Sequence, residues 1–580
     1  MRILFLHPED SPELGPWVGQ NWDWVTDLGH AGTETYKRWG ALLGCVAEPL
    51  DILSLEEVRG IRELLGVGVG RLMDREGLDW WELNAMFFHQ RLETLIALRS
   101  LVSRLGNQDQ LFVTRSGFHA DVLGLLAGDR LKCFSGRSTG GERTLNHYRR
   151  VWSRFPLPQL FEILGDKYDA AYAVRRRFAR RTMPCQTPVV LLPSAYGNVS
   201  RTGIAYAKTS PETNFLLMTT RRSGEVSNPP ANVSCGRLAA YATHRPQTAA
   251  EHNRLAEQWR ELRGDLQSVP EFDLLERLGS LDSFPRLLRQ GLAIRDAWRS
   301  VLEQEPVQAV LCGDDSNPYT HIPLLLARGR GIPTIACHHG ALDGRHLFKQ
   351  NYADVILAKG RMEADYLVRV CGVSPDVVEV GAPARRVCHR VDPRQAGAAA
   401  PIVFFSEAYE IAGGRGEEFY RELLPATADL AARTGRDLLI KLHPAESRRD
   451  RERLVNELLP AEQRHSTKII SAPLTQELLS GAWFGITIRS TVVMECALLG
   501  IPCFLCEWLE YGPYGYAEQF SRFRAGHGLR SAAEIGEIPR ILEHWSSRPE
   551  TVRDLWQSIT PDRFRELVSS REMFRHVVAS

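Results

Sequence analysis

Polar residues that can bind an anion follow an apolar run over residues 438–442, which is typical of a buried strand. His443 comes directly after this run and precedes Pro444, which restricts it to extended backbone. From that position the imidazole can donate a hydrogen bond to a phosphate oxygen, with Lys441 beside it. A structural histidine at a strand end is the competing interpretation, and the sequence leaves both open.

A second anion-binding stretch follows the apolar run over residues 484–488. Arg489, Ser490 and Thr491 stand at the start of a predicted helix that contains Glu495. Hydroxyl groups and the free N–H groups of a helix N-terminus bind anions. We therefore predict that these three residues bind phosphate and that Glu495, about one turn further on, accepts ribose hydroxyls. An ordinary helix cap with a surface glutamate is the alternative.

Acidic and imidazole groups follow two further predicted strands. Asp314 and Asp315 come after residues 309–312, and His339 follows residues 334–337. Because parallel strand ends meet at one edge of a sheet, these groups can share a site and deprotonate a hydroxyl. Adjacent carboxylates raise one pKa of the pair by repulsion, which suits a base. We predict catalytic roles for all three residues, although one aspartate of the pair can instead cap a helix.

The elements that position these residues follow from the hydrophobic pattern of the 580-residue chain. Short apolar runs alternate with longer amphipathic stretches, which is typical of parallel sheets covered by helices. An Arg- and Pro-containing stretch near 175–188 and an Ala- and Pro-containing linker over 387–400 indicate boundaries. We predict a helix-rich α/β block over 1–185, a Rossmann-like domain over 186–386, and a second Rossmann-like domain with a helical tail over 401–580.

The first block offers candidates for acceptor binding. Glu9 and Asp10 follow the first predicted strand, and Tyr196 and Asn198, in the following domain, lie in a small polar turn after a later strand. Six of the 13 Trp residues also lie in this block. Indole rings can stack on sugars, but packing in a core is their commoner use, and we favour it here. The six are Trp17, Trp22, Trp24, Trp39, Trp80 and Trp81.

Composition excludes several classes of protein. The 71 basic and 70 acidic residues give a net charge of +1, which argues against a dedicated nucleic-acid binder. No stretch reaches the roughly 18 apolar residues of a membrane helix, and the first apolar run is too short for a signal peptide. The 11 Cys residues lack a framework spacing, and Cys503 and Cys506 lie in an apolar run that indicates a buried strand. We expect a cytoplasmic protein with reduced thiols.

Residues 186–530 resemble nucleotide-sugar glycosyltransferases of the GT-B fold, above all bacterial sialyl- and polysialyltransferases, Kdo transferases and teichoic-acid glycerophosphotransferases. Residues 441–444 resemble their His-Pro motif, residues 489–491 their Ser/Thr motif, and residues 495–502 the donor-site helix of GT-B enzymes. His339 with Gly340 is similar to the His-Gly of the glycerophosphotransferases, and Asp314 with Asp315 is similar to the acidic motif of the sialyltransferases.

The resemblance implies two Rossmann-like domains that face a cleft, with an N-terminal α/β extension. It also implies that His443, Ser490 and Thr491 hold donor phosphate, that Glu495 holds the ribose, and that His339 or an acidic neighbour is the base. The substrate would be a nucleotide-activated sugar, with no cofactor, and the acceptor a glycan or a lipid-linked glycan of a bacterial capsule or envelope. A lipid-linked acceptor would suggest peripheral association with the inner face of the membrane.

The chain departs from the pattern of these enzymes at two positions. Many retaining GT-B enzymes carry a second Glu eight positions before the donor-helix Glu, where this chain has Thr487, which weakens a retaining assignment. The sialyltransferase acidic motif usually ends in Gly, where this chain has Ser316. The chain contains no Asp-x-Asp, so we expect no obligatory metal.

A sugar-nucleotide 2-epimerase shares the fold and is an alternative, although the Gly-Gly turn that we expect in such enzymes is replaced here by residues 489–491. A non-catalytic carbohydrate- or nucleotide-binding scaffold is the third hypothesis.

Overall fold

The structure is a computed structural model that describes residues 1–569, except for 9, 14, 30, 135–184, 243–245, 317, 350–352, 386–396, 398, 411–413 and 547–548. Most of the predicted linker, and most of the stretch predicted to form the boundary near 175–188, lie outside the described residues. Within the described part of the chain, no helix is both long enough and apolar enough to cross a membrane.

The described residues form three β-sheets, and every strand pairing within them is parallel. The N-terminal sheet contains β1 (Arg2–Phe5), β2 (Trp24–Thr26), β3 (Val46–Ala47), β4 (Gln110–Val113) and β5 (Leu131–Cys133). The middle sheet contains β6 (Val189–Ser194), β7 (Phe215–Thr219), β8 (Val233–Arg237), β9 (Val307–Cys312), β10 (Thr334–Cys337), β11 (Val355–Ala358) and β12 (Val378–Val380). The C-terminal sheet contains β13 (Ile402–Phe405), β14 (Leu438–Lys441), β15 (Thr467–Ile470), β16 (Phe484–Thr487), β17 (Cys503–Cys506) and β18 (His527–Leu529).

All three sheets share one topology. The strand orders β3-β2-β1-β4-β5, β8-β7-β6-β9-β10-β11-β12 and β15-β14-β13-β16-β17-β18 each begin as 3-2-1-4-5 when strands are numbered within their sheet. This is the Rossmann order, in which ligands bind where the order reverses, between strands 1 and 4 at their carboxyl ends. The predicted α/β fold class with Rossmann-like domains is therefore confirmed, and the N-terminal sheet adds a third example.

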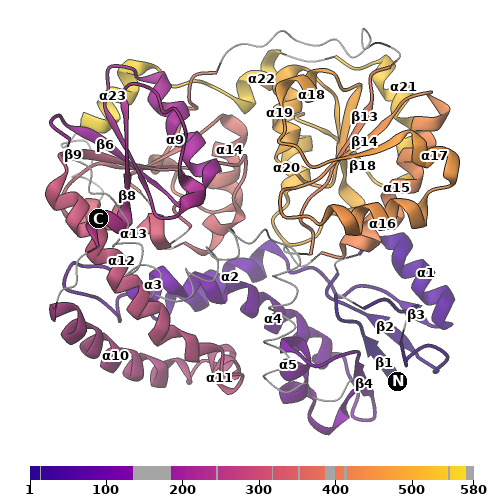
Figure 1. Ribbon diagram of the computed structural model, residues 1–580. Helices are drawn as coiled ribbons and strands as arrows, with labels where there is room; N and C mark the ends of the chain where they lie inside the picture. Colours follow the sequence, from indigo (N-terminus) through magenta and orange to yellow (C-terminus); the bar gives the residue numbers. More distant parts are fainter. Residues whose placement is uncertain are drawn as a thin grey trace. The chain divides into compact units, whose positions relative to one another are not determined.

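Helices connect the strands (Figure 1). The first part of the chain contains α1 (Thr33–Leu43), α2 (Leu55–Gly66), α3 (Trp80–Ala85), α4 (His89–Ser103) and α5 (Phe118–Ala127). The middle part contains α9 (Gly197–Thr209), α10 (Pro246–Leu266), α11 (Pro270–Arg277), α12 (Phe284–Gln304), α13 (Pro318–Gly329) and α14 (Arg361–Asp365). The last part contains α15 (Gly416–Arg433), α16 (Arg448–Leu458), α17 (Ala461–His465), α18 (Gln476–Ser480), α19 (Val492–Leu499), α20 (Tyr516–Arg522), α21 (Ile538–Glu543), α22 (Pro549–Leu555) and α23 (Pro561–Ser569).

The chain forms two compact units that do not follow sequence order. One unit combines residues 1–56, 93–156 and 387–555, and thus holds the N-terminal and C-terminal sheets. The other combines residues 57–92, 157–386 and 556–580 around the middle sheet. Helix α23 returns to the middle sheet, where its Phe564 stacks on Tyr206 of α9 at 6.0 Å. The predicted block 1–185 contributes to both units.

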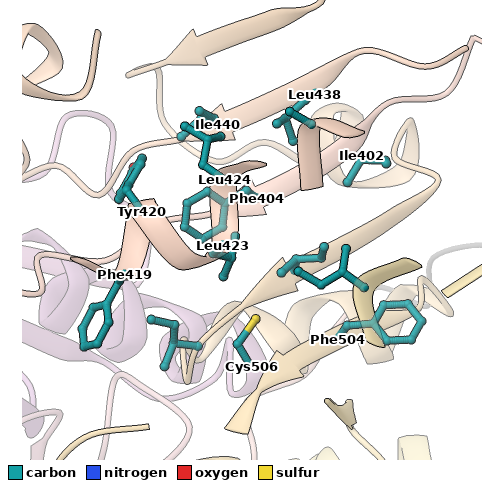
Figure 2. Close-up of a cluster of buried hydrophobic side chains, with 14 of the residues drawn as sticks. Ile402, Phe404, Phe419, Tyr420, Leu423, Leu424, Leu438, Ile440, Phe504 and Cys506 are labelled. Atoms are coloured by element: carbon teal, nitrogen blue, oxygen red, sulfur yellow. The ribbon is translucent and has the colours of Figure 1, made fainter. Parts of the chain in front are cut away.

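Apolar residues of the C-terminal sheet form a buried core with α15 (Figure 2). Phe404 and Ile440 lie on neighbouring strands, and Leu423 and Leu424 of α15 pack against them, all four completely buried. Cys503 and Cys506 are both completely buried in β17, which confirms the prediction of a strand there. The core fixes α15 on the sheet, and α15 in turn carries the residues that join this sheet to the N-terminal one.

The six Trp residues of the first block are all buried, which confirms the prediction of core packing. Trp22 contacts Phe112 of β4 edge-on at 5.1 Å, within the core of the N-terminal sheet. Trp81 packs instead in the other unit, where it stacks on Trp259 of α10 at 6.1 Å. One tryptophan-rich stretch of sequence therefore supplies the cores of two separate units.

Arg415, the residue before α15, inserts into the carboxyl edge of the N-terminal sheet. Its guanidinium forms an ion pair with Asp27 at 2.5 Å, and both side chains are almost completely buried. It also donates to the backbone carbonyls of His7 and Asp10, at 3.0 and 2.7 Å, and lies 4.8 Å from the centre of the Trp39 ring. A buried ion pair is favourable only when further hydrogen bonds satisfy its polar atoms, and here the strand-end carbonyls provide them.

Glu422 of α15 makes a second connection, by capping α1. Helix α1 begins without a side-chain cap of its own. Glu422 accepts the backbone N–H and the hydroxyl of Thr35, at 2.8 and 2.6 Å, and so satisfies a free donor in the first turn. Gly32 permits this contact, because a Cβ atom at that position would lie 2.3 Å from the Glu422 carboxylate.

Substitution of Arg415 tests the joint between the two sheets. We expect Arg415→Ala to lower the free energy of unfolding by about 3–5 kcal/mol, because the Asp27 carboxylate then stays buried without a cation. Urea unfolding followed by Trp fluorescence measures the change. Arg433→Ala, which removes an exposed pair with Asp429 from the same helix, is the control and should cost under about 1 kcal/mol. Equal effects of the two substitutions would contradict the structural role of Arg415.

Candidate functional site

The reversal point of the C-terminal sheet lies between β13 and β16, and polar residues follow both strands. Glu407, two residues after β13, accepts the backbone N–H of Arg489 at 3.0 Å. Burial raises the pKa of Glu407, and Arg489 partly opposes this shift. The segment 406–407 and the segment 489–491 are thus held together at the place where a Rossmann-like sheet binds its ligand.

The Arg489 side chain is engaged by the protein. Its guanidinium lies 3.7 Å from the centre of the Tyr511 ring and donates a hydrogen bond to the Tyr511 carbonyl. Burial opposes the charge, but Tyr511 and Glu407 raise the pKa of Arg489 above its ordinary value. The guanidinium therefore adds positive potential to the crevice, but it is held by protein groups and does not itself bind the ligand.

Ser490 and Thr491 precede α19 and are more accessible. Thr491 is exposed, Ser490 is half-buried, and the Ser490 hydroxyl is 3.4 Å from the N–H of Val492. Glu495 lies half-buried in the first turn of the same helix. The predicted phosphate and ribose residues are therefore together on one helix end at the reversal point.

His443 follows the neighbouring strand β14 and faces solvent. Its Nδ1 accepts the N–H of Ala445 at 3.2 Å, so a neutral ring carries its proton on Nε2. Burial, with the charge of Lys441, lowers the pKa of His443 and keeps the ring neutral near pH 7. Lys441 itself is buried and donates to the carbonyl of Leu442 at 2.5 Å. The His443 ring can thus donate to an incoming anion, whereas Lys441 supports the strand end.

The reversal point of the middle sheet, between β6 and β9, holds a different set of groups. Tyr196 follows β6, Asp314 follows β9 and His339 follows β10, which lies next to β9. The Tyr196 hydroxyl donates to Asp314 Oδ2 at 2.6 Å and lies 3.4 Å from each nitrogen of the His339 ring. The two rings meet edge-on with their centres 5.3 Å apart.

The protonation states in this set suit proton transfer. Burial lowers the pKa of His339, and Asp314 partly opposes that shift, so the ring is neutral and can accept a proton. Burial raises the pKa of Tyr196, and the Asp314 carboxylate raises it further, so its hydroxyl stays protonated. Tyr196 and His339 are partly exposed while Asp314 is buried, so the tyrosine links the accessible imidazole to the carboxylate behind it.

Asp315 is placed differently from Asp314. It forms an ion pair with Lys349, and both side chains are buried. Burial acts to raise the pKa of Asp315, but Lys349 and the neighbouring His346 lower it below its usual range. Asp315 is therefore held in a buried ion pair, and of the two aspartates only Asp314 accepts a hydrogen bond from Tyr196, which in turn contacts His339.

Lys359 holds the turn that carries His339. Its ammonium group donates to the carbonyls of His338 and Gly340, the residues on either side of His339. The carboxylate of Glu363 lies 3.6 Å away. Neither Lys359, directly after β11, nor Lys349, after a short helical turn, could be identified from the sequence, because a lone lysine at such a position has no distinctive neighbours.

The residues predicted to bind an acceptor are dispersed. Asp10 pairs with Arg115 and accepts the hydroxyl of Thr114 at 2.5 Å, at the reversal point of the N-terminal sheet. Asn198 is exposed on the first turn of α9, and Glu9 lies outside the described residues.

Across the described part of the chain, no group of three or more His, Cys, Asp or Glu residues has the arrangement of a metal site.

Comparisons with known proteins do not assign the chain to a family. No family model matches the chain, and no curated protein matches it. Similar solved structures include a UDP-GlcNAc 2-epimerase from Methanocaldococcus jannaschii, with 11% identity over 68% of this chain and 99% of that chain (TM-score 0.39). Others are the calicheamicin glycosyltransferase CalG4, with 15% identity over 68% and 100% (TM-score 0.40), and the lipopolysaccharide outer core galactosyltransferase WaaB, with 12% over 66% and 99% (TM-score 0.37).

A carboxyl group with a strongly shifted pKa lies near Arg489. Glu93 of α4 accepts the Tyr514 hydroxyl at 3.0 Å, and Tyr514 stacks on Tyr516, whose ring centre is 5.6 Å from the Arg489 guanidinium. Burial raises the pKa of Glu93 to about 7, and the Tyr514 bond lowers it only partly. The pKa of Glu93 is thus close to neutral pH, and Tyr514 and Tyr516 connect its carboxyl group to Arg489.

The raised pKa predicts a pH-dependent stability. Between pH 4.5 and 7 the folded protein holds a proton on Glu93 that the unfolded chain releases, so Glu93 destabilises the fold increasingly as pH rises. We expect Glu93→Gln to raise the melting temperature relative to the parent protein at pH 8 and to change it little at pH 4.5. Glu462→Gln, at an exposed position in the same unit, is the control. A difference that does not change with pH would contradict the shifted pKa.

Proposed function

We propose that this chain is a glycosyltransferase of the GT-B architecture, which transfers a sugar or a polyol phosphate from a nucleotide-activated donor to a hydroxyl acceptor. One observation carries the proposal: two Rossmann-order sheets present complementary chemistry at their reversal points. The C-terminal sheet presents donors for an anion, and the middle sheet presents the linked Tyr196, Asp314 and His339. The resemblance of residues 186–530 to capsule and envelope enzymes supports an acceptor that is a glycan or a lipid-linked glycan.

Each set of groups has a role in such a transfer. In sugar transfer, the neutral His339 accepts the proton of the acceptor hydroxyl, whose oxygen forms the new bond to the anomeric carbon. The bond from that carbon to the phosphate oxygen breaks, and the nucleotide departs with the electron pair. In transfer of a polyol phosphate, the same oxygen bonds instead to the phosphorus that carries the polyol, and the bond from that phosphorus to the oxygen of the departing nucleotide breaks. His443, Ser490 and the first N–H groups of α19 stabilise the charge that develops on the phosphate. Glu495 accepts the ribose hydroxyls.

A different reaction of the same donor is the alternative. A sugar-nucleotide 2-epimerase uses the same phosphate-binding groups but needs no acceptor. Incubation of the purified protein with UDP-GlcNAc alone separates the two, because an epimerase forms the C2 epimer without any acceptor present. Formation of that epimer at a catalytic rate would contradict the transferase proposal.

Nucleotide binding is the first test. We expect one of CMP, UDP, GDP or a CDP-polyol to raise the melting temperature, since a ligand at 100 times its dissociation constant stabilises the folded state by about 2.7 kcal/mol. The shift should be lost in His443→Ala and retained in His465→Ala, an exposed histidine of the same unit. Absence of any shift across the panel would overturn the proposal.

Proton transfer is the second test. We expect His339→Ala to lower kcat by about 100- to 10,000-fold, the usual contribution of general base catalysis, while nucleotide affinity is unchanged. Tyr196→Phe removes the hydroxyl that links His339 to Asp314 and should move the acidic limb of the kcat–pH profile. A loss of nucleotide affinity in His339→Ala, or an unchanged pH profile in Tyr196→Phe, would be inconsistent with these roles.

A further inference from the structure

A cavity of about 530 Å³ opens in the unit that holds the N-terminal and C-terminal sheets, at the joint between them. Its lining includes Glu48 and Asp51, which follow β3, and Thr33 of α1. Trp508 and Glu510 complete it from the segment that follows β17. The cavity thus lies at the carboxyl ends of strands from both Rossmann-order sheets, and it has the size of an ordinary ligand pocket.

The walls of this cavity are fixed before any ligand arrives. The buried carboxylate of Glu422 accepts the N–H and hydroxyl of Thr35 with one oxygen. Its other oxygen accepts the indole N–H of Trp508 at 3.1 Å. One side chain therefore positions both the start of α1 and the indole ring. Glu510 is held in the same way, because it accepts the N–H of Ala517 at 3.0 Å.

The lining chemistry suits a saccharide. An aromatic face can stack on the C–H face of a sugar ring, and carboxylates and hydroxyls accept and donate bonds to sugar hydroxyls. The Glu48 side chain is exposed and, within the described part of the chain, makes no hydrogen bond or ion pair, whereas its backbone N–H donates to the carbonyl of Val25 at 3.1 Å. The carboxylate is therefore available to a ligand. The charged lining residues are Glu48, Asp51, Glu510 and a single Lys37.

The charge of this lining distinguishes it from the nucleotide site. Lys37 is paired with Glu34 at 2.6 Å, and Asp51 is paired with Arg104. Three carboxylates against one lysine disfavour phosphates and sialic acids through like-charge repulsion and favour neutral sugars. The cavity is therefore unsuited to the donor nucleotide, although Trp508 and Glu510 follow β17, the strand next to β16 in the C-terminal sheet.

We infer that this cavity binds a neutral oligosaccharide segment of the acceptor glycan. The identification of the ligand as an acceptor rests on the proposed function, whereas the binding itself does not require turnover. The cavity would hold a part of the glycan chain remote from the reacting hydroxyl and so keep the acceptor on the enzyme between transfers. The N-terminal sheet, through Glu48 and Asp51, would then supply acceptor affinity rather than catalysis.

Binding of neutral trisaccharides to the full-length protein tests the inference. Saturation-transfer difference NMR with maltotriose, cellotriose and chitotriose measures binding, and 3′-sialyllactose serves as the anionic comparison. We expect at least one neutral trisaccharide to bind in the millimolar range or better and sialyllactose to bind more weakly. Glu48→Gln should weaken binding about tenfold or more through loss of a charge-assisted hydrogen bond. Asp129→Asn, an exposed carboxylate outside the cavity, should leave it unchanged.

The same variants separate this inference from the proposed function. Nucleotide-dependent stabilisation should be unaffected by Glu48→Gln. Absence of binding by every neutral trisaccharide, stronger binding of sialyllactose, or equal losses in Glu48→Gln and Asp129→Asn would each overturn the inference and leave the transferase proposal intact. Loss of nucleotide binding in Glu48→Gln would show that the cavity belongs to the donor site, which also overturns it. Trisaccharide binding without any nucleotide binding would support the cavity and overturn the transferase proposal.

Discussion

The Arg415 guanidinium, buried against Asp27 and the strand-end carbonyls of the N-terminal sheet, is the contact on which one unit of this protein depends. Neither partner can be buried alone, because an isolated charge in a dry interior costs several kcal/mol. The N-terminal sheet therefore completes its carboxyl edge with a residue from the C-terminal part of the chain. Glu422 extends the same dependence to α1, and together the two side chains fix the geometry of the cavity beside Trp508.

Three copies of one topology allow different chemistry to develop at equivalent positions. Each reversal point carries polar groups: Asp10 with Arg115 in the N-terminal sheet, Tyr196 with Asp314 in the middle sheet, and Glu407 with the Arg489 backbone in the C-terminal sheet. In the first, the groups neutralise each other. In the second, a tyrosine links a carboxylate to a neutral imidazole. In the third, helix α19 leaves donors accessible. The topology provides the place, and the loops determine the chemistry.

Much of the fold could be predicted from the sequence, because buried parallel strands are short apolar runs and β1, β13 and β16 have that pattern. The edge strands β3 and β8 could not, since β3 is only two residues long and the polar residues Ser234 and Arg237 interrupt the apolar pattern of β8. Position along the chain identified Asp314 and His339 as neighbours but could not separate Asp314 from Asp315. That distinction depends on Lys349, whose ion pair with Asp315 joins residues 34 positions apart.

The joint between the N-terminal and C-terminal sheets also has a consequence for biosynthesis. Asp27 and Arg415 are 388 residues apart in the chain. At about 5–20 residues per second, a ribosome makes the second of them roughly 20 to 80 s after the first. Throughout that interval the nascent N-terminal sheet has an open carboxyl edge and a carboxylate without its cation. The N-terminal sheet therefore cannot reach its final state until Arg415 has been made, and chaperones have a long window in which to bind it.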